Sequence, residues 1–138
     1  MSADLTARQR AGDLVIAAAR EHYRARVSAE GLRRIEVAEW EADGRPLVIY
    51  FRPVLTMYQR HRIDSRIGEG RIPTIVEGLI VRALDSEGRP LFAEADRHAL
   101  MNHVDADVLM KIAEEIVAGS VAEPSAEALE ENSEAAAR

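Results

Sequence analysis

The residues best suited to chemistry gather in the basic stretch 52–71, which lies close to Tyr50, Phe51 and Tyr58. Its cationic side chains are Arg52, Arg60, His61, Arg62, Arg66 and Arg71. Guanidinium groups pair with phosphates and aromatic rings stack on bases, so such a stretch could bind single-stranded nucleic acid. The net charge of −6 and the apolar run around Tyr50 and Phe51 disfavour that reading. A surface that receives an acidic helix of a partner, or the chain's own acidic tail, fits equally well.

The remaining histidines, carboxylates and glycines form no recognised catalytic or metal-binding pattern. His98 and His103 are five residues apart, whereas two ligands on one helix face are four apart. The chain has no Cys, which excludes a thiolate nucleophile and a disulfide framework. The glycines of 68–70 lack both the dinucleotide fingerprint and the Lys-Ser/Thr pair of a P-loop. We therefore expect no catalytic residues, no metal and no cofactor, although a small enzyme whose site assembles only in space stays open.

Length and charge predict one globular domain over residues 1–119 and an acidic, flexible tail over residues 120–138. A chain of 138 residues is the usual size of one domain. Residues 1–71 carry 13 Arg against 10 acidic residues, whereas residues 72–138 carry 5 cations against 14 acidic residues. The tail holds five of these Glu and few large apolar residues.

The chain shows no signal for a membrane or for export. It has no apolar run of about 18 residues, the length that a membrane-spanning helix needs. Its first residues, MSADLTARQR, lack the cationic start and apolar centre of a signal peptide. We therefore expect a cytoplasmic protein that does not bind membranes.

The first half of the sequence predicts one helix and a β-hairpin. Residues 5–26 favour a helix, and Gly31 is its expected stop. The runs 32–40 and 46–54 are typical of strands, and they flank the strong turn signal Asp43-Gly44. The second run is almost continuously apolar, so we expect it to be buried on both faces.

Four helices are predicted after the hairpin. Their ranges are 55–67, 72–84, 94–102 and 105–119, with Asp105 as an N-cap and Gly119 as the final stop. Apolar residues recur at steps of three and four in the 72–84 and 105–119 ranges, as on the buried face of a helix. The expected fold class is thus α+β: a helix-dominated domain with an antiparallel hairpin near residues 32–54, followed by a helical bundle.

A polar turn separates the second and third of these helices. Asp85 and Gly88 predict the turn, and Pro90 stiffens its exit. Leu91 and Phe92 follow immediately, and we expect them to return to the core and fasten two helices together.

The order of these elements resembles that of the tail assembly chaperones of long-tailed bacteriophages. The hairpin region carries the motif IEVAEWEADGRPLVIYFRPVLTMYQRHRI, residues 35–63. The helical region carries IVEGLIVRALDSEGRPLFAEADRHALMNHVDADVLMKIAEEIVAGS, residues 75–120, with the Asp-x-x-Gly-x-Pro-Leu-Phe turn. The Glu-rich ending SAEALEENSEAAAR, residues 125–138, is similar to the family's usual ending. The resemblance spans about residues 33–138.

The resemblance implies a binding function rather than an enzymatic one. Such chaperones coat the long helical tape measure protein in the host cytoplasm, keep it soluble, and leave as the tail tube assembles. They are not part of the mature virion. Many family members also exist in a frameshift-extended form that recruits the tail tube protein.

Reversible binding of a long amphipathic helix favours modest apolar grooves with charged rims. The ranges 46–54, 72–84 and 108–117 are candidates for either core or groove, and self-association through exposed apolar surface stays open. The residues that we expect at the partner surface are Arg52, Tyr58, Arg60, Arg62, Arg66, Leu91 and Phe92. The competing interpretation is a small nucleic-acid-binding or regulatory module that uses the 52–71 arginines.

Overall fold

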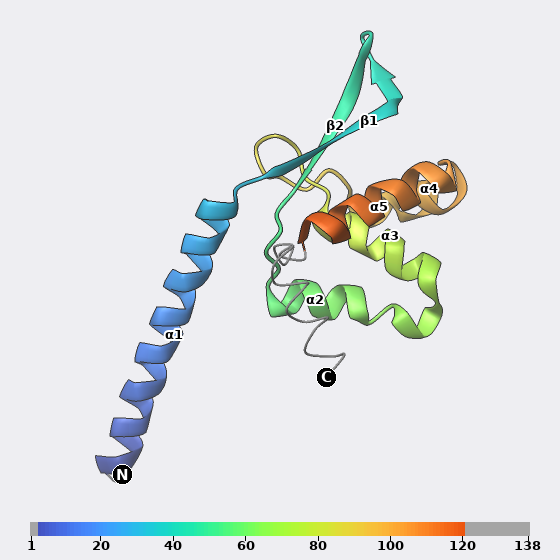
Figure 1. Cartoon of the computed structure of the whole chain (residues 1–138). Helices are drawn as coiled ribbons and strands as arrows, with labels where there is room; N and C mark the ends of the chain where they lie inside the picture. Colours follow the sequence, from blue (N-terminus) through green and yellow to red (C-terminus); the bar gives the residue numbers. More distant parts are fainter. Residues whose placement is uncertain (1–2, 121–138) are drawn as a thin grey trace, which may run out of the picture. The chain divides into compact units, whose positions relative to one another are not determined.

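The computed structural model describes residues 3–120, and the chain divides into two compact units between Gly31 and Leu32 (Figure 1). The sequence predicts one domain over residues 1–119, whereas here the N-terminal helix forms a unit of its own. The predicted acidic tail lies outside the described residues, apart from Ser120.

The first unit is the single helix α1 (Ala3–Glu30). It is longer than the predicted range 5–26. Gly31 ends it in the left-handed conformation, with φ 63°, and its N–H donates to the Val27 carbonyl at 3.0 Å. This is the arrangement that favours Gly after a helix, because a side chain is strained at positive φ.

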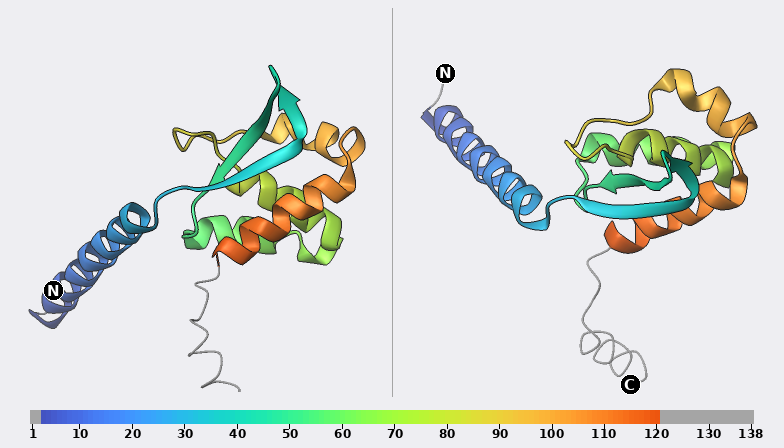
Figure 2. Two further views of the ribbon diagram at one scale, coloured as in Figure 1. Left: turned by 45° about the horizontal axis from the view of Figure 1, so that its top comes forward. Right: turned by 90° about the horizontal axis from the view of Figure 1, so that it is seen from above.

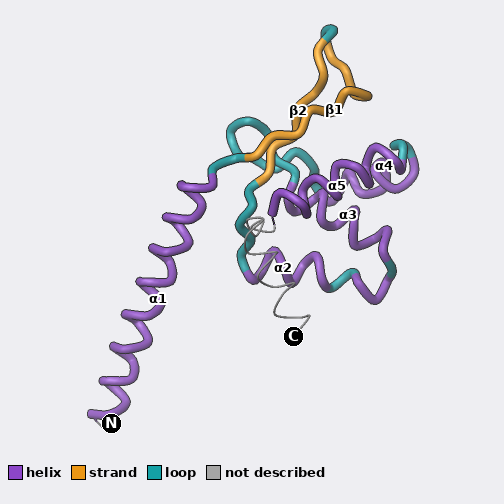
Figure 3. Tube along the Cα trace, in the orientation of Figure 1, coloured by secondary structure: helices purple, strands orange, loops and turns teal. Residues whose placement is uncertain are grey.

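The second unit begins with the antiparallel hairpin of β1 (Arg33–Ala42) and β2 (Arg45–Phe51) (Figure 3). The turn residues Asp43 and Gly44 both have positive φ, 54° and 75°. Such a two-residue turn matches the right-handed twist of the strands, which explains the Asp-Gly signal. The predicted fold class, helix-dominated α+β with a hairpin, is confirmed.

The hairpin is irregular near its tip, which the sequence pattern did not predict. Val37 pairs with Leu47, but the next pair is Glu41 with Pro46, so β1 has extra residues that β2 lacks. Extra residues bend a strand and increase its twist. Trp40 lies in this bulge and packs half-buried against the core.

Four α-helices and two short 3-10 helices follow the hairpin within the described residues (Figure 2). They are α2 (Met57–Asp64), η1 (Ile67–Glu69), α3 (Arg71–Arg82), η2 (Glu94–Asp96), α4 (Arg97–Asn102) and α5 (Ala106–Ser120). Thr56 caps α2 through a reciprocal pair of hydrogen bonds with Gln59 at 3.2 and 3.0 Å. The predicted 55–67 helix therefore starts later and ends earlier, at Asp64.

The core lies between one face of the hairpin and the helices α3 and α5. Its members are almost all aliphatic: Ile35, Val37, Ile49, Phe51, Val76, Leu79, Ile80, Ala83, Leu100, Val108, Leu109, Ile112 and Ile116. The predicted stripes of α3 and α5 supply most of them. Burial of this apolar area is the main stabilising contribution to the unit.

The turn after α3 ties the end of that helix to the hairpin. Leu84 exchanges two backbone hydrogen bonds with Tyr50, at 2.9 and 2.7 Å, so it forms a short bridge beside β2. The Asp85 carboxylate accepts the N–H groups of Glu87 and Arg89, each at 2.9 Å. Gly88 adopts φ 82° within this turn.

Leu91 and Phe92 differ in how they continue from the turn. The Leu91 N–H donates to the Ala83 carbonyl at 3.0 Å, yet its side chain is exposed. Phe92 packs half-buried against the core. The backbone of Leu91 is therefore tied to the residue after α3, whereas Leu84 makes the bonds to β2. The expected return of Leu91 to the core is wrong, and only Phe92 of the two packs against it.

The last helix does not stop at Gly119 as predicted, because α5 extends one residue further, to Ser120. The missing side chain of Gly119 is instead needed for packing. A Cβ added at Gly119 would lie 2.6 Å from Cζ of Phe51, a ring that is 3% exposed. We expect Gly119→Ala to lower the free energy of unfolding by about 1–3 kcal/mol, because a buried ring must move aside. Urea unfolding followed by the fluorescence of Trp40, the single Trp of the chain, measures this.

Gly78→Ala in α3 is the matched control. A Cβ added at Gly78 meets nothing within 4 Å, so we expect a gain of about 0.5–1 kcal/mol from helix propensity. Equal effects of the two substitutions would contradict the proposed contact between Gly119 and Phe51.

Candidate functional site

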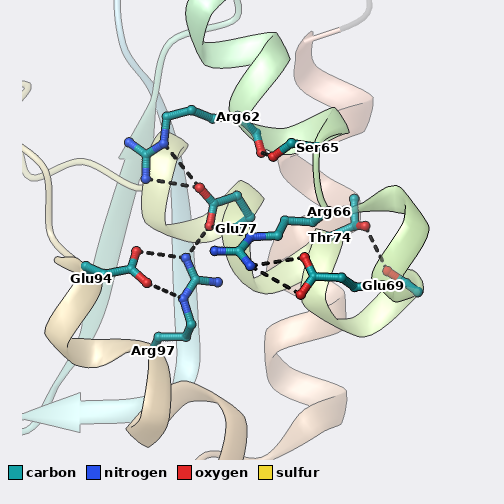
Figure 4. A network of polar contacts seen from close by, with 9 residues as sticks. Arg62, Ser65, Arg66, Glu69, Thr74, Glu77, Glu94 and Arg97 are labelled. Atoms are coloured by element: carbon teal, nitrogen blue, oxygen red, sulfur yellow. Dashed lines mark hydrogen bonds and ion pairs between the residues drawn. The ribbon is translucent and has the colours of Figure 1, made fainter.

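A buried carboxylate on α3 organises the polar side of the helical layer. Glu77 is 4% exposed although it is charged. Burying an isolated carboxylate costs several kcal/mol, so it must be met by cations and hydrogen bonds. Arginines from α2, from the segment after it and from α4 meet this requirement (Figure 4).

Three guanidinium groups surround Glu77. Arg62 contacts Oε1 through Nε at 3.1 Å and Nη2 at 3.0 Å, a two-point contact. Arg97 donates to Oε2 through Nη2, and Nε of Arg66 lies 3.6 Å from the same oxygen. Two exposed acids extend the network: Glu69 pairs with Arg66 at 3.0 Å and Glu94 with Arg97 at 2.6 Å.

The arginines decide the protonation state of Glu77. Burial alone would raise the pKa of its carboxyl group, but the hydrogen bonds and charges of Arg97 and Arg62 outweigh burial and hold the pKa below 4.5. The hydrogen bond to Glu94, followed by the one to Glu77, raises the pKa of Arg97. The network is therefore a charged clamp between helices at neutral pH.

A second site is an apolar groove between α2, α3 and α5, with a volume of about 170 Å³. Its apolar lining comes from Leu55, Ile63, Ile75, Leu79, Ala113, Ile116 and Val117. Arg60 and Arg82 are its cationic members. The groove thus combines room for an aliphatic side chain with positive charge, the pairing that an amphipathic acidic segment requires.

Among residues 3–120, Arg82 at the end of α3 is buried without a matching acid. It is 8% exposed, and its Nη2 donates to the Arg52 carbonyl at 2.8 Å and to Oγ of Ser120. Its Nε has no hydrogen-bond partner among residues 3–120. The guanidinium also lies 5.9 Å from the centre of the Phe51 ring.

The surroundings of Arg82 disfavour the protonated, charged form of its guanidinium group. Burial, together with the neighbouring charge of Arg60, lowers the pKa of Arg82 to about 10. Carbonyl and hydroxyl oxygens solvate a guanidinium but do not neutralise it. In the described part of the chain, Arg82 is therefore a buried cation that is solvated only in part.

The structure distributes the residues predicted for a partner surface over several places. Arg62 and Arg66 come together around Glu77, whereas Arg60 lines the groove. Arg52 lies over the turn, where its Nη2 would be 2.6 Å from a Cβ at Gly88. Tyr58 on α2 is exposed.

Metal-type ligands do not gather in the described residues. No group of three or more His, Cys, Asp or Glu there could hold a metal ion. The rings of His98 and His103 meet edge to face with their centres 5.6 Å apart.

None of the described helices is long and apolar enough to cross a membrane.

Comparison with known proteins gives no relative: no family model, no curated protein and no solved structure matches the chain.

Sequence reasoning did not identify Glu77, Arg82 and Arg97. A signal existed for the first two, because both interrupt the apolar helix 72–84, and a charged residue there is either exposed or paired. No local signal links Arg97 to Glu77, which lies 20 residues earlier in the chain.

Replacing Glu77 by Gln should remove the clamp. We expect the free energy of unfolding to fall by about 2 kcal/mol at pH 7, because three guanidinium groups lose their shared anion. The lowered pKa means that this stabilisation is complete above pH 4.5 and is lost as the pH falls through the folded-state value. Urea unfolding at several pH values should show the difference between the wild type and Glu77→Gln shrinking below pH 4.5.

Glu69→Gln is the control, because it removes an exposed partner of the same arginine cluster. Its expected effect is within about 0.5 kcal/mol. A pH-independent loss in Glu77→Gln would show that the amide disturbs packing rather than charge.

Proposed function

We propose that the protein is a phage tail assembly chaperone that binds the tape measure protein and keeps it soluble while the tail tube assembles. Two things support this. One is the resemblance over about residues 33–138, in which hairpin, helix, polar turn and acidic ending follow the family's order. The other is the groove between α2, α3 and α5.

The groove is the observation that carries the proposal. A tape measure protein is a long helix with apolar residues at regular steps, and such a helix needs a receptor for single apolar side chains. A groove of about 170 Å³ accepts one such side chain. Arg60 at the groove suits the acidic residues of an amphipathic partner.

The groove also suits reversible binding. One buried aliphatic side chain contributes roughly 1.5–3 kcal/mol, which gives weak binding for each copy of the chaperone. Many copies along one partner would hold it in solution together and could still be displaced singly by tube subunits. We propose that this takes place in the host cytoplasm, and that a frameshift-extended form recruits the tail tube protein.

Nucleic-acid binding through residues 52–71 is the weaker alternative. Arg62 and Arg66 already carry ion pairs with Glu77 and Glu69, and binding phosphates would break them. If this alternative holds, retention on single-stranded nucleic acid falls steeply with salt and is lost in Arg60→Ala.

Substitution within the groove tests the chaperone proposal. Val117 lines the groove and is 59% exposed, so the fold should tolerate Val117→Gln. We expect roughly tenfold less soluble tape measure protein to co-purify after co-expression, because the amide opposes burial of an apolar side chain. Affinity capture followed by sizing of the complex measures both yield and copy number.

Leu47→Gln on β2 is the matched control, since Leu47 is 46% exposed and lies outside the groove. Equal losses in the two variants would place binding elsewhere. A wild-type protein that elutes alone while the tape measure protein precipitates would refute the proposed function.

A further inference from the structure

The hairpin leaves one backbone edge unpaired. In the described part of the chain the sheet has two strands, and β1 pairs only with β2. The outer edge of β2 is met at Tyr50, which exchanges two backbone hydrogen bonds with Leu84. The outer edge of β1 has no such bridge among residues 3–120. An unpaired strand edge is a template for another extended segment.

The bonds of Tyr50 show which backbone groups of β1 face outward. Successive residues of an antiparallel strand direct their N–H and C=O groups to opposite sides. Tyr50 directs its groups toward Leu84, so Arg34, its partner in β1, directs its own groups away from β2. The same alternation applies to Glu36, two residues further along. Arg34 and Glu36 therefore present two N–H and two C=O groups at the outer edge.

A cleft beside this edge gives room for an added strand. Helix α5 packs against β1 (Figure 2). Between them lies an open cleft of about 600 Å³, here called the edge cleft, to which residues 32–36, Phe51, Glu115 and Gly119 contribute. A segment that adds a strand gains affinity from main-chain hydrogen bonds and specificity from its alternate side chains.

The side chains of β1 define the sequence that fits. Arg34 and Glu36 are exposed on one face of the strand, whereas Ile35 between them is 6% exposed and faces the core. In an antiparallel added strand, the residue opposite Glu36 comes first and the residue opposite Arg34 follows two positions later. Opposite charges across a strand pair stabilise it, and like charges destabilise it. The fitting order is therefore basic, apolar, acidic.

We propose that the outer edge of β1 binds an extended segment of a partner protein as an additional antiparallel strand, in which a basic and an acidic residue flank one apolar residue. The apolar residue lies beside Ile35, on the side of the edge cleft. The irregularity after Val37 limits the new ladder to residues 33–37. This surface is separate from the groove between α2, α3 and α5, which the proposed function assigns to a helix.

Two other occupants fit less well. Arg34-Ile35-Glu36 itself has the required order, so β1 of a second copy has matching charges. Antiparallel pairing of two edge strands would however bring both copies of α5 to the same side of the joined sheet, next to each other. An extended segment brings no helix to that side. Residues 121–138 lack the order, because their only basic residue is the terminal Arg138.

Titration of the isotope-labelled, full-length chain with the blocked peptide TVKVEVT tests the proposal by NMR. The Lys and Glu of this peptide oppose Glu36 and Arg34. We expect the amide protons of Arg34 and Glu36 to shift downfield, because they gain carbonyl acceptors. The peptide TVEVKVT has the same composition with the charges exchanged, and should bind about fivefold more weakly or worse.

N-methylated peptides separate backbone pairing from side-chain contacts. In TVKVEVT the N–H of Glu faces β1, and the N–H of the central Val faces away. A methyl group on the first nitrogen should weaken binding at least about tenfold, whereas one on the second should change it by less than about twofold.

The reciprocal change in the protein is the double variant Arg34→Glu with Glu36→Arg. Both side chains are exposed, so the fold should tolerate the exchange. We expect this variant to prefer TVEVKVT over TVKVEVT, because both cross-strand charge pairs are reversed.

Several outcomes would overturn the proposal. They are the absence of amide shifts at millimolar peptide, equal binding of the two peptides by the wild type, or equal effects of the two N-methylations. A free chain that is dimeric, with the Arg34 and Glu36 amides already protected from exchange, would assign the edge to a second copy. No tape measure protein takes part, so these outcomes are independent of the proposed function.

Discussion

The buried carboxylate of Glu77 is the constraint on which the helical layer depends. An anion removed from water must be neutralised where it lies, and here the cations come from three other places in the chain. Arg62 belongs to α2, Arg66 follows it, and Arg97 begins α4. Because all three must reach one side chain, α2 and α4 are fixed against α3 by charge as well as by apolar contact. Helix α2 also forms one wall of the groove between α2, α3 and α5.

Helix α3 buries one acid, Glu77, and one base, Arg82, and the two side chains have different surroundings. Glu77 is surrounded by three guanidinium groups, whereas Arg82, five residues later, has oxygens without negative charge. The charge of Glu77 is neutralised by these arginines, so the first arrangement contributes to the stability of the fold. The second leaves Arg82 solvated only by a carbonyl and a hydroxyl oxygen among the described residues, so its charge is not neutralised there.

The proposed chaperone requires both a stable helical layer and a groove that carries positive charge. A protein that holds a helical partner briefly needs a rigid receptor and a weak, replaceable contact. The hairpin, α3 and α5 supply the rigid receptor, since their shared core is aliphatic and well buried. In the proposed function the groove supplies the contact, and the positive charge of Arg60 and Arg82 at the groove favours acidic amphipathic segments.

The sequence by itself determined the local elements. Asp43 and Gly44 fixed the hairpin because few residues tolerate positive φ, and the apolar stripes of α3 and α5 fixed which faces are buried. Only the tertiary structure decided that Arg62 and Arg66 serve Glu77, that Gly119 makes room for Phe51, and that α1 forms a separate unit. The ion pairs of Glu77 and the contact of Gly119 with Phe51 join residues that are far apart in the chain, such as Arg62 and Glu77. Local spacing encodes helix and strand periods, but it contains no information on which distant side chains will meet.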